Sequence, residues 1–229
     1  MYEAVHAHPD GESTAARVAA TAGRMGYDGV VIRARTAAPD YAAVREASDI
    51  DVVDAVEVVA PDPERASGAV GGLRPDHTLL CVRGGTDRLN RFAVESERVD
   101  VLTRPMADGG DVNHVLANCA AANGVRIEFD FGPVLRTTGG ERVRALRDLR
   151  KLRELVADAD APFVVSATPE SHLQLRASRE LIAVGEAVGF DPETVRAGLC
   201  EWGDLAERNR HRQSESFVEP GVERGRHDE

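Results

Sequence analysis

Seven short runs of aliphatic and β-branched residues recur along the chain, and stretches with helical periodicity separate them. Runs this short and this apolar are typical of strands that are buried on both faces. Strands that alternate with helices are joined by right-handed crossovers and therefore lie parallel to one another. The predicted strands cover residues 2–7, 29–33, 51–60, 78–83, 99–104, 125–131 and 162–167.

Seven strand–helix units come close to a complete (β/α) barrel. We therefore predict an α/β fold, a TIM-barrel-like barrel of about seven parallel strands, as a single domain over residues 1–212. A doubly wound open sheet is the alternative, although its dinucleotide-binding form is disfavoured because no G-x-G-x-x-G motif follows a strand. Residues 213–229 lack apolar periodicity, and we predict a disordered tail there.

Capping residues predict where several helices begin and end. Ser13 is a candidate N-cap for a helix that ends at Gly26, and a second predicted helix runs from Asp111 to Gly124. A proline directly after a candidate N-cap is a helix-start signal, and Pro192 follows Asp191 in this way.

The acidic net charge indicates the salt concentration in which the protein works rather than the partners that it binds. The formal net charge is −11, and the 28 basic residues include a single lysine, Lys151. An acidic excess with almost no lysine is typical of a salt-loving microbe, in which an acidic surface keeps proteins soluble. The acidic charge therefore does not exclude RNA as a partner, although nucleic-acid-binding domains are usually basic. Because no long apolar run or signal segment is present, we expect a cytoplasmic protein with no membrane partner.

Two histidines, His6 and His8, flank one alanine at the end of the first apolar run. Residues two apart on a strand point to the same face, so both side chains are candidates to meet at one metal ion. The segment resembles the first motif of the PHP phosphoesterases, with its histidine pair, then Asp10-Gly11, then a helix. The resemblance implies a PHP-like barrel and, as one alternative, a metal-dependent phosphoesterase with ligands at the carboxyl ends of the strands.

Most other ligands that this resemblance implies are replaced. Glu57 matches a glutamate ligand, but Arg33-Ala34-Arg35 stands in place of an Asp-His pair and Arg104-Pro105 in place of a histidine before proline. Ser166-Ala167-Thr168-Pro169 replaces the final Asp and His. Arginine stays protonated and cannot bind a metal, whereas its forked donors suit phosphate. We predict an anion site, no catalytic residue and no bound metal. The vestigial metal candidates are His6, His8 and Glu57.

A second resemblance covers nearly the whole chain. The features that carry it are Asn113-His114 in a helix after a strand, the strand RIEFDF, the basic helix after it, the run from Leu175 to Ile182, and the closing ERNR. In this order they are similar to protein component 3 of archaeal ribonuclease P, the counterpart of the thirty-kilodalton subunit of the eukaryotic enzyme. That family is itself related to PHP barrels, which accounts for the histidine pair.

This resemblance implies a non-catalytic, RNA-binding subunit that supports the catalytic RNA in removing the 5′ leader of precursor tRNA. The implied partners are the ribonuclease P RNA, protein component 2 in a heterodimer or heterotetramer, other ribonuclease P proteins and, indirectly, precursor tRNA. We expect no cofactor on the chain itself, with Mg²⁺ serving the RNA-based activity of the complex. The isolated chain is expected to be inactive.

Two groups of basic residues are candidates for contacts with RNA phosphates. One group follows the strands, and the other lies in the helix over residues 141–155, opposite an apolar side formed by Val143, Leu146, Leu149, Leu152 and Val156. Pairing with nearby acids or helix capping is the alternative for each residue. The predicted RNA-binding residues are Arg33, Arg35, Arg83, Arg104, Asn113, His114, Arg144, Arg147, Lys151 and Arg176. We also expect Arg33→Ala together with Arg104→Ala to weaken assembly with RNA or cleavage while leaving the fold intact.

Overall fold

Strand pairing follows chain order in this computed structural model, which describes residues 1–214, 217–219 and 222–223. Each of seven parallel strands pairs with the next, and together they form a nearly closed barrel. The strands are β1 (Tyr2–Val5), β2 (Gly29–Ala34), β3 (Asp51–Val58), β4 (Leu79–Arg83), β5 (Val101–Thr103), β6 (Arg126–Asp130) and β7 (Phe163–Ser166). All seven predicted strands and the TIM-barrel-like fold are confirmed.

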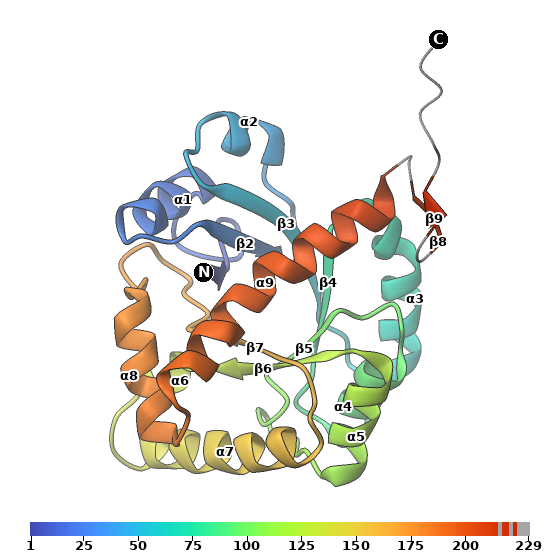
Figure 1. Cartoon of the computed structure of the whole chain (residues 1–229), viewed down its shortest axis with the longest axis vertical. Helices are drawn as coiled ribbons and strands as arrows, with labels where there is room; N and C mark the ends of the chain where they lie inside the picture. Colours follow the sequence, from blue (N-terminus) through green and yellow to red (C-terminus); the bar gives the residue numbers. More distant parts are fainter. Residues whose placement is uncertain (215–216, 220–221, 224–229) are drawn as a thin grey trace.

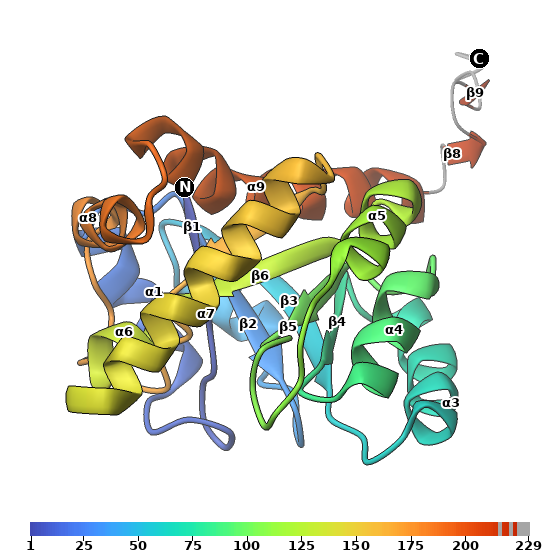
Figure 2. The same ribbon diagram turned by 90° about the horizontal axis from the view of Figure 1, so that it is seen from below.

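Helices fill the connections and cover the outside of the barrel (Figures 1 and 2). They are α1 (Ala15–Arg24), α2 (Tyr41–Glu46), α3 (Pro63–Leu73), the 3-10 turn η1 (Arg74–Asp76), α4 (Asp87–Glu95), α5 (His114–Asn123), α6 (Gly132–Arg136), α7 (Gly139–Asp158), α8 (Ser178–Val188) and α9 (Pro192–Gln213). No helix in the described part of the chain is long and apolar enough to cross a bilayer.

Side-chain caps begin most of the helices, and two predicted starts are corrected. The cap of α1 is Thr14 rather than Ser13, and the cap of α5 is Asn113 rather than Asp111. In both cases the side-chain oxygen of the cap accepts a backbone N–H of the first turn, which is the usual reason for such a residue there. The predicted start of α9 at Asp191 and Pro192 is confirmed.

The C-terminal boundary lies close to the predicted one, since α9 ends at Gln213. Two short strands follow, β8 (Phe217–Glu219) and β9 (Val222–Glu223), which pair antiparallel. The predicted disordered tail over residues 213–229 otherwise lies outside the described residues, so that prediction and the single-domain boundary stay predictions.

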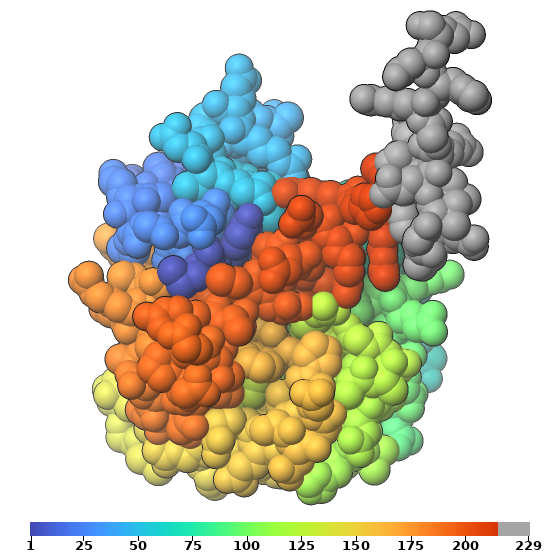
Figure 3. All heavy atoms as spheres, viewed as in Figure 1, coloured from blue at the N-terminus to red at the C-terminus, as the bar shows by residue number. Residues whose placement is uncertain are grey.

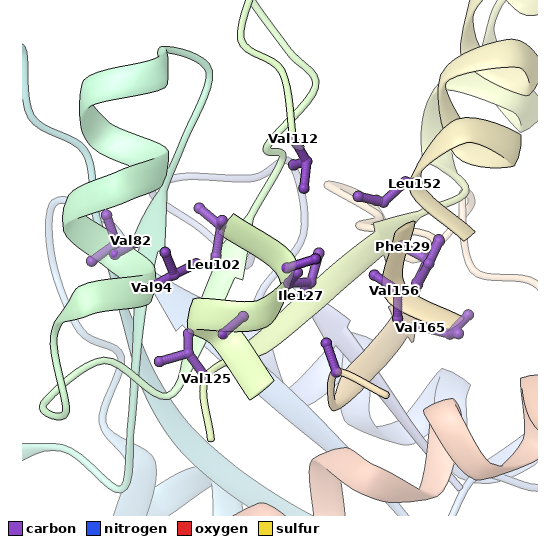
Figure 4. Close-up of a cluster of buried hydrophobic side chains, with 14 of the residues drawn as sticks. Val82, Val94, Leu102, Val112, Val125, Ile127, Phe129, Leu152, Val156 and Val165 are labelled. Carbon is purple, nitrogen blue, oxygen red and sulfur yellow. The ribbon is translucent and has the colours of Figure 1, made fainter. Parts of the chain in front are cut away.

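The main apolar core lies between the barrel and its outer helices. Leu102, Ile127 and Phe129 point outward from neighbouring strands toward Val94 of α4 and Val156 of α7 (Figure 4). Burial of each such side chain contributes about 1.5–3 kcal/mol, so this layer holds the helices to the sheet.

The amino end of α7 extends beyond this core. The predicted apolar side of the helix is buried only in its second half, because Val143 is 66% exposed. The first half of α7 therefore lies at the protein surface.

Helix α9 closes the amino end of the barrel. Its Trp202 is fully buried against small inward-facing side chains such as Ala4 and Val31, and its Nε1 donates a hydrogen bond to Val165 O at 2.9 Å. Arg210 of the same helix pairs with Asp51 at the start of β3. Figure 3 shows α9 running across this face of the molecule, so the carboxyl end of the barrel is the open one.

No strand ladder joins β1 to β7, and the gap is bridged by side chains and by a backbone hydrogen bond from His6 N–H to Pro169 O at 3.0 Å. Glu3 is fully buried there and accepts a hydrogen bond from the backbone of Ala167 at 2.9 Å and from the hydroxyl of Ser166 at 3.0 Å. Burial raises the pKa of Glu3 to about 7. The Glu3 carboxyl therefore links β1 to the end of β7 where no eighth strand lies between them.

Candidate functional site at the carboxyl ends of the strands

The alternation of residues along each strand gathers polar side chains inside the open end of the barrel. In β6, Ile127 and Phe129 face the outer helices, so Glu128 and Asp130 face the interior. Side chains alternate in the same way in the other strands, so polar residues that are distant in sequence form one layer inside the barrel. Its members are His6, Arg33, Arg35, Glu57, Thr103, Glu128, Asp130, Ser166 and Thr168.

Arg33 lies at the centre of this layer and has no exposed surface. Its Nη1 donates to Glu128 Oε1 at 2.7 Å and lies 3.7 Å from Glu57 Oε1. Its guanidinium also lies 5.9 Å from the centre of the Trp202 ring. The prediction that Arg33 presents its fork to phosphate at the rim is therefore wrong, because buried carboxylates already hold it inside the barrel.

Burial and pairing act in opposite directions on these charges. Burial raises the pKa of Glu128 to about 7, although Arg33 beside it lowers the value. Burial also works against the charge of Arg33, but Glu128 and Glu57 outweigh it and raise the pKa of the guanidinium. Arg33 therefore remains a permanent internal cation.

Arg35 lies between His6 and Glu57, which are two of the three metal-ligand candidates from the sequence. Its Nε donates to Glu57 Oε2 at 2.6 Å, and its Nη2 donates to His6 Nε2 at 2.8 Å. His6 donates from Nδ1 to the backbone oxygen of Arg33 at 2.9 Å. The lone pair of His6 Nε2 that a metal would use is thus engaged by an N–H of the Arg35 guanidinium.

His8 does not join His6. The chain turns back directly after Ala7, whose oxygen accepts the backbone N–H groups of Asp10 and Gly11, and His8 is exposed. A side chain at Gly11 would collide with the oxygen of His6, so glycine is needed for this tight return. The expectation that His6 and His8 converge is therefore wrong.

The residues present do not fit a metal centre. Within the described part of the chain, no group of three or more His, Cys, Asp or Glu side chains is arranged to hold a metal ion. Of the vestigial candidates, His6 and Glu57 lie 3.6 Å apart, but Arg35 contacts both. The described residues of the barrel mouth therefore do not fit metal-dependent hydrolysis.

We expect Mn²⁺, Zn²⁺ or EDTA to leave the Tm of the purified chain unchanged, because the guanidinium of Arg35 already satisfies both potential ligands. Differential scanning calorimetry checks this. A rise in Tm with Mn²⁺ that is abolished by His6→Gln, or phosphoester turnover with the same dependence, would contradict the assignment.

His6 is expected to make stability fall in acid. Burial, with help from Arg33, lowers its pKa from 6.5 to about 3. Below pH 6.5 the unfolded chain therefore binds a proton at His6 that the folded chain does not. The free energy of unfolding should fall as pH drops from 6.5 toward 3, by up to about 1.4 kcal/mol per pH unit from this group.

Urea unfolding of wild type and His6→Gln between pH 4 and pH 7.5 isolates this contribution from the opposite one of Glu3 and Glu128. The raised pKa values of those two carboxyls make their contribution fall as pH rises from 4.5 toward 7. The stability advantage of wild type over the variant should shrink as the pH is lowered. A constant difference would show that His6 titrates alike in both states.

Arg104 and Asp130 meet at the mouth of the barrel. Arg104 Nε lies 4.0 Å from Asp130 Oδ2, and Thr168 donates to Asp130 Oδ1 at 2.6 Å. Arg104 and Thr168 both have left-handed backbones, with φ of 49° in each. Such conformations cost about 1–3 kcal/mol outside glycine and cluster at functional sites.

A cavity of about 540 Å³ opens beside these residues. Its walls are the loop over residues 104–108, the end of β6, α6 and residues 141–152 of α7, which crosses near β6 (Figure 2). Arg104 from the strand-end group and Arg144 from the basic helix both line it. The two groups of arginines that the sequence suggested separately therefore meet at one site.

The remaining predicted RNA contacts have other partners in the structure. Three cations form ion pairs with exposed or half-exposed carboxylates, which are Arg83–Asp108 (3.2 Å), Arg147–Asp148 (2.9 Å) and Lys151–Asp111 (2.6 Å). Pairs of this kind are weak and exchangeable, so contact of these residues with RNA stays a prediction.

Arg176, Asn113 and His114 lie apart from the cavity. Arg176 Nη1 donates to the backbone oxygen of Leu175 at 2.9 Å. Asn113 caps α5, as the structural alternative anticipated, and His114 is its exposed first residue. Glu128 and Asp130 were not among the predicted site residues. Their alternation with apolar residues in the segment RIEFDF was the available signal.

The fold and the site define a TIM-barrel-like protein that holds an arginine–carboxylate cluster inside its open end and two further guanidinium groups at a cavity beside it. A family model, RNase P subunit p30, matches residues 1–214. The chain belongs to this family. Its function is that of a protein subunit of ribonuclease P, and the phosphoesterase alternative is not favoured.

Individual relatives agree with this membership. Ribonuclease P protein component 3 of Halorubrum lacusprofundi is 61% identical over 100% of this chain and 99% of its own length. The protein of the same name from Haloarcula marismortui is also 61% identical, over 97% of this chain and 96% of its own length. Their haloarchaeal origin agrees with the salt-adapted composition. A chain of an archaeal ribonuclease P solved by cryo-EM with mature tRNA shares the fold, with a TM-score of 0.86 at 21% identity over 100% of both chains.

Proposed function

We propose that this subunit binds RNA at the mouth of its barrel and supports the catalytic RNA in removing the 5′ leader of precursor tRNA. The observation that carries the proposal is the meeting of Arg104 and Arg144 at one cavity beside a barrel interior that does not fit a metal. Arg144 has no ion-pair or hydrogen-bond partner among the described residues. Such guanidinium groups form bidentate contacts with phosphate, part of whose strength is geometric.

The proposed partners are the ribonuclease P RNA, protein component 2 in a heterodimer or heterotetramer, and the other ribonuclease P proteins. Precursor tRNA is contacted indirectly. Mg²⁺ belongs to the RNA-based activity of the complex, and the chain contributes no cofactor. The complex is proposed to work in the cytoplasm. Family membership supports assembly in a protein–RNA complex.

Reconstituted precursor-tRNA cleavage in high salt tests the proposal. Omission of this chain should lower the cleavage rate, and Arg104→Ala with Arg144→Ala should weaken its association with the RNA-containing complex by about tenfold or more, because each charged hydrogen bond contributes about 1.5–3 kcal/mol. Binding is measured by crosslinking and by titration of the subunit into the remaining components.

The matched control is Arg91→Ala, which removes an exposed arginine on α4 that forms an ion pair with Glu95 of the same helix. It should bind and support cleavage like wild type. The proposal fails if the double variant assembles and supports cleavage at the wild-type level, or if cleavage is the same with and without the subunit.

A further inference from the structure

The mouth cavity has an apolar wall and a charged interior. Leu149 and Leu152 of α7, with Pro105 and Met106 of the opposite loop, form the apolar sides. The volume of about 540 Å³ falls within the range of small-molecule sites, about 300–1,000 Å³. The cavity is thus large enough for a flat ligand of moderate size with one apolar face.

Two carboxylate oxygens in the cavity have acceptor capacity that the described residues do not use. Glu128 is 1% exposed, and its Oε2 has no hydrogen-bond partner, although Arg33 occupies Oε1. Asp130 uses Oδ1 for Thr168 and the backbone of Gly132, while Oδ2 has only the distant Arg104 at 4.0 Å. A buried acceptor without a donor is costly, so these oxygens point to a ligand with two donors.

Three more carboxylates line the cavity, Asp108, Glu141 and Asp148. Two of them already have arginine partners outside the cavity, since Asp108 pairs with Arg83 and Asp148 with Arg147. Arg104 and Arg144 line the same cavity without a close carboxylate partner in the described chain. A bound ammonium or guanidinium group would leave them unneutralised, whereas a phosphate would pair with them. The occupant therefore carries both a pair of donors and an anionic group.

We propose that the cavity binds a guanine nucleotide, with the donor edge of the base at Glu128 and Asp130 and its phosphate at Arg104 and Arg144. Guanine presents N1–H and N2–H side by side, whereas adenine, cytosine and uracil each lack this pair of adjacent donors. Unpaired bases in RNA are read on this edge and stack against guanidinium planes or apolar side chains.

The electrostatics of Glu128 agree with this assignment. Burial raises its pKa to about 7 because the carboxylate has lost water without gaining enough donors. Two N–H groups from a base would supply donors at that position. The ligand has two sources, an unpaired guanosine of RNA or a free guanine nucleotide, and the RNA source rests on the proposed function.

Calorimetric titration of the full chain in high salt with GMP, AMP, CMP and UMP tests the proposal. GMP should bind at least about tenfold more tightly than the others, since a site built for hydrogen bonds rejects ligands that leave its polar groups unpaired. Glu128→Gln should weaken GMP binding about tenfold. Arg144→Ala should weaken GMP binding but not guanosine binding, because guanosine has no phosphate.

Glu154→Gln is the matched control, since it makes the same change on the exposed side of α7 away from the cavity. It should bind GMP like wild type. If Glu128→Gln does not fold by circular dichroism, Asp130→Asn takes its place and should show the same loss. Equal affinity for GMP and AMP, wild-type affinity in the variant that folds, or tighter binding of arginine amide than of GMP would overturn the proposal.

The pentanucleotides UUGUU and UUAUU separate the two sources. Selective binding of UUGUU assigns the cavity to an unpaired guanosine of RNA, and binding of GMP without UUGUU assigns it to a free nucleotide. The proposed function is judged separately, by precursor-tRNA cleavage with and without the subunit. A chain that supports cleavage but does not bind GMP would reject this inference and leave the proposed function in place.

Discussion

Arg33→Ala is expected to lower the free energy of unfolding by about 3–5 kcal/mol, because removal of one partner leaves buried carboxylates without their cation. Arg33 has no exposed surface and pairs with Glu128 at 2.7 Å inside the barrel. Glu57, whose pKa burial alone would raise, is held at about 2 by the neighbouring arginines and loses one of them. A loss of this size approaches the total stability of many domains.

Urea unfolding followed by tryptophan fluorescence measures this effect, since Trp202 is the sole tryptophan and is buried. Arg104→Ala is the matched control at another strand end, and as a partly exposed arginine it should change stability by less than about 1 kcal/mol. Arg33→Met combined with Glu128→Gln should be less damaging than Arg33→Met alone. If Arg33→Ala unfolds like wild type, the central ion cluster does not stabilise the barrel.

From the sequence, Arg33→Ala together with Arg104→Ala was expected to leave the fold intact. From the structure, we expect this double variant to be destabilised, because Arg33 is buried and paired. The two arginines follow similar strands and look alike in the sequence, but one is internal and one lies at the mouth. A loss of ribonuclease P assembly in that double variant would report unfolding rather than a lost phosphate contact. Arg104→Ala with Arg144→Ala avoids this confusion.

Trp202→Ala should lower the free energy of unfolding of the wild-type protein by about 3–5 kcal/mol, because it leaves a cavity at the closed end of the barrel. The indole is fully buried, contacts the small inward-facing residues of the strands and donates a hydrogen bond to Val165 O. Alanine would leave both a cavity and an unsatisfied backbone oxygen. Urea unfolding followed by circular dichroism measures the change, since the variant lacks the fluorescent probe.

Trp202→Phe is the matched control, because it keeps an aromatic ring but loses the N–H donor. It should be intermediate between wild type and alanine. Because the ring lies 5.9 Å from the Arg33 guanidinium, the losses from Arg33→Met and Trp202→Phe should not be additive in a double-mutant cycle. Strict additivity, or an alanine variant as stable as the phenylalanine one, would argue against this account of the closed end.

Much of the fold follows from local pattern. The strand β4, for example, is predicted from residues 78–83 and observed at Leu79–Arg83, because a parallel strand covered on both faces must be apolar along its length. Chain order then leaves few arrangements, since right-handed crossovers place each strand beside the previous one. The caps of α1 and α5 shift by only one or two residues from their predicted positions.

The chemistry of the mouth does not follow from local pattern. Arg33 and Glu128 are 95 residues apart in the chain, yet they lie 2.7 Å apart. His6 and Glu57 are candidates from the sequence, but no motif indicates that the guanidinium of Arg35 lies between them. That contact depends on the direction of a long side chain across three strands.

Periodicity was thus sufficient to predict a seven-stranded barrel, and a resemblance in motif order was sufficient to predict its family. Tertiary structure was needed to separate an internal arginine from two arginines at a shared cavity, and to show that His8 leaves the barrel. The physical reason is that burial and helical or strand periods are properties of short segments. The partner of a charge, by contrast, is set by register and side-chain direction between segments that are distant in sequence.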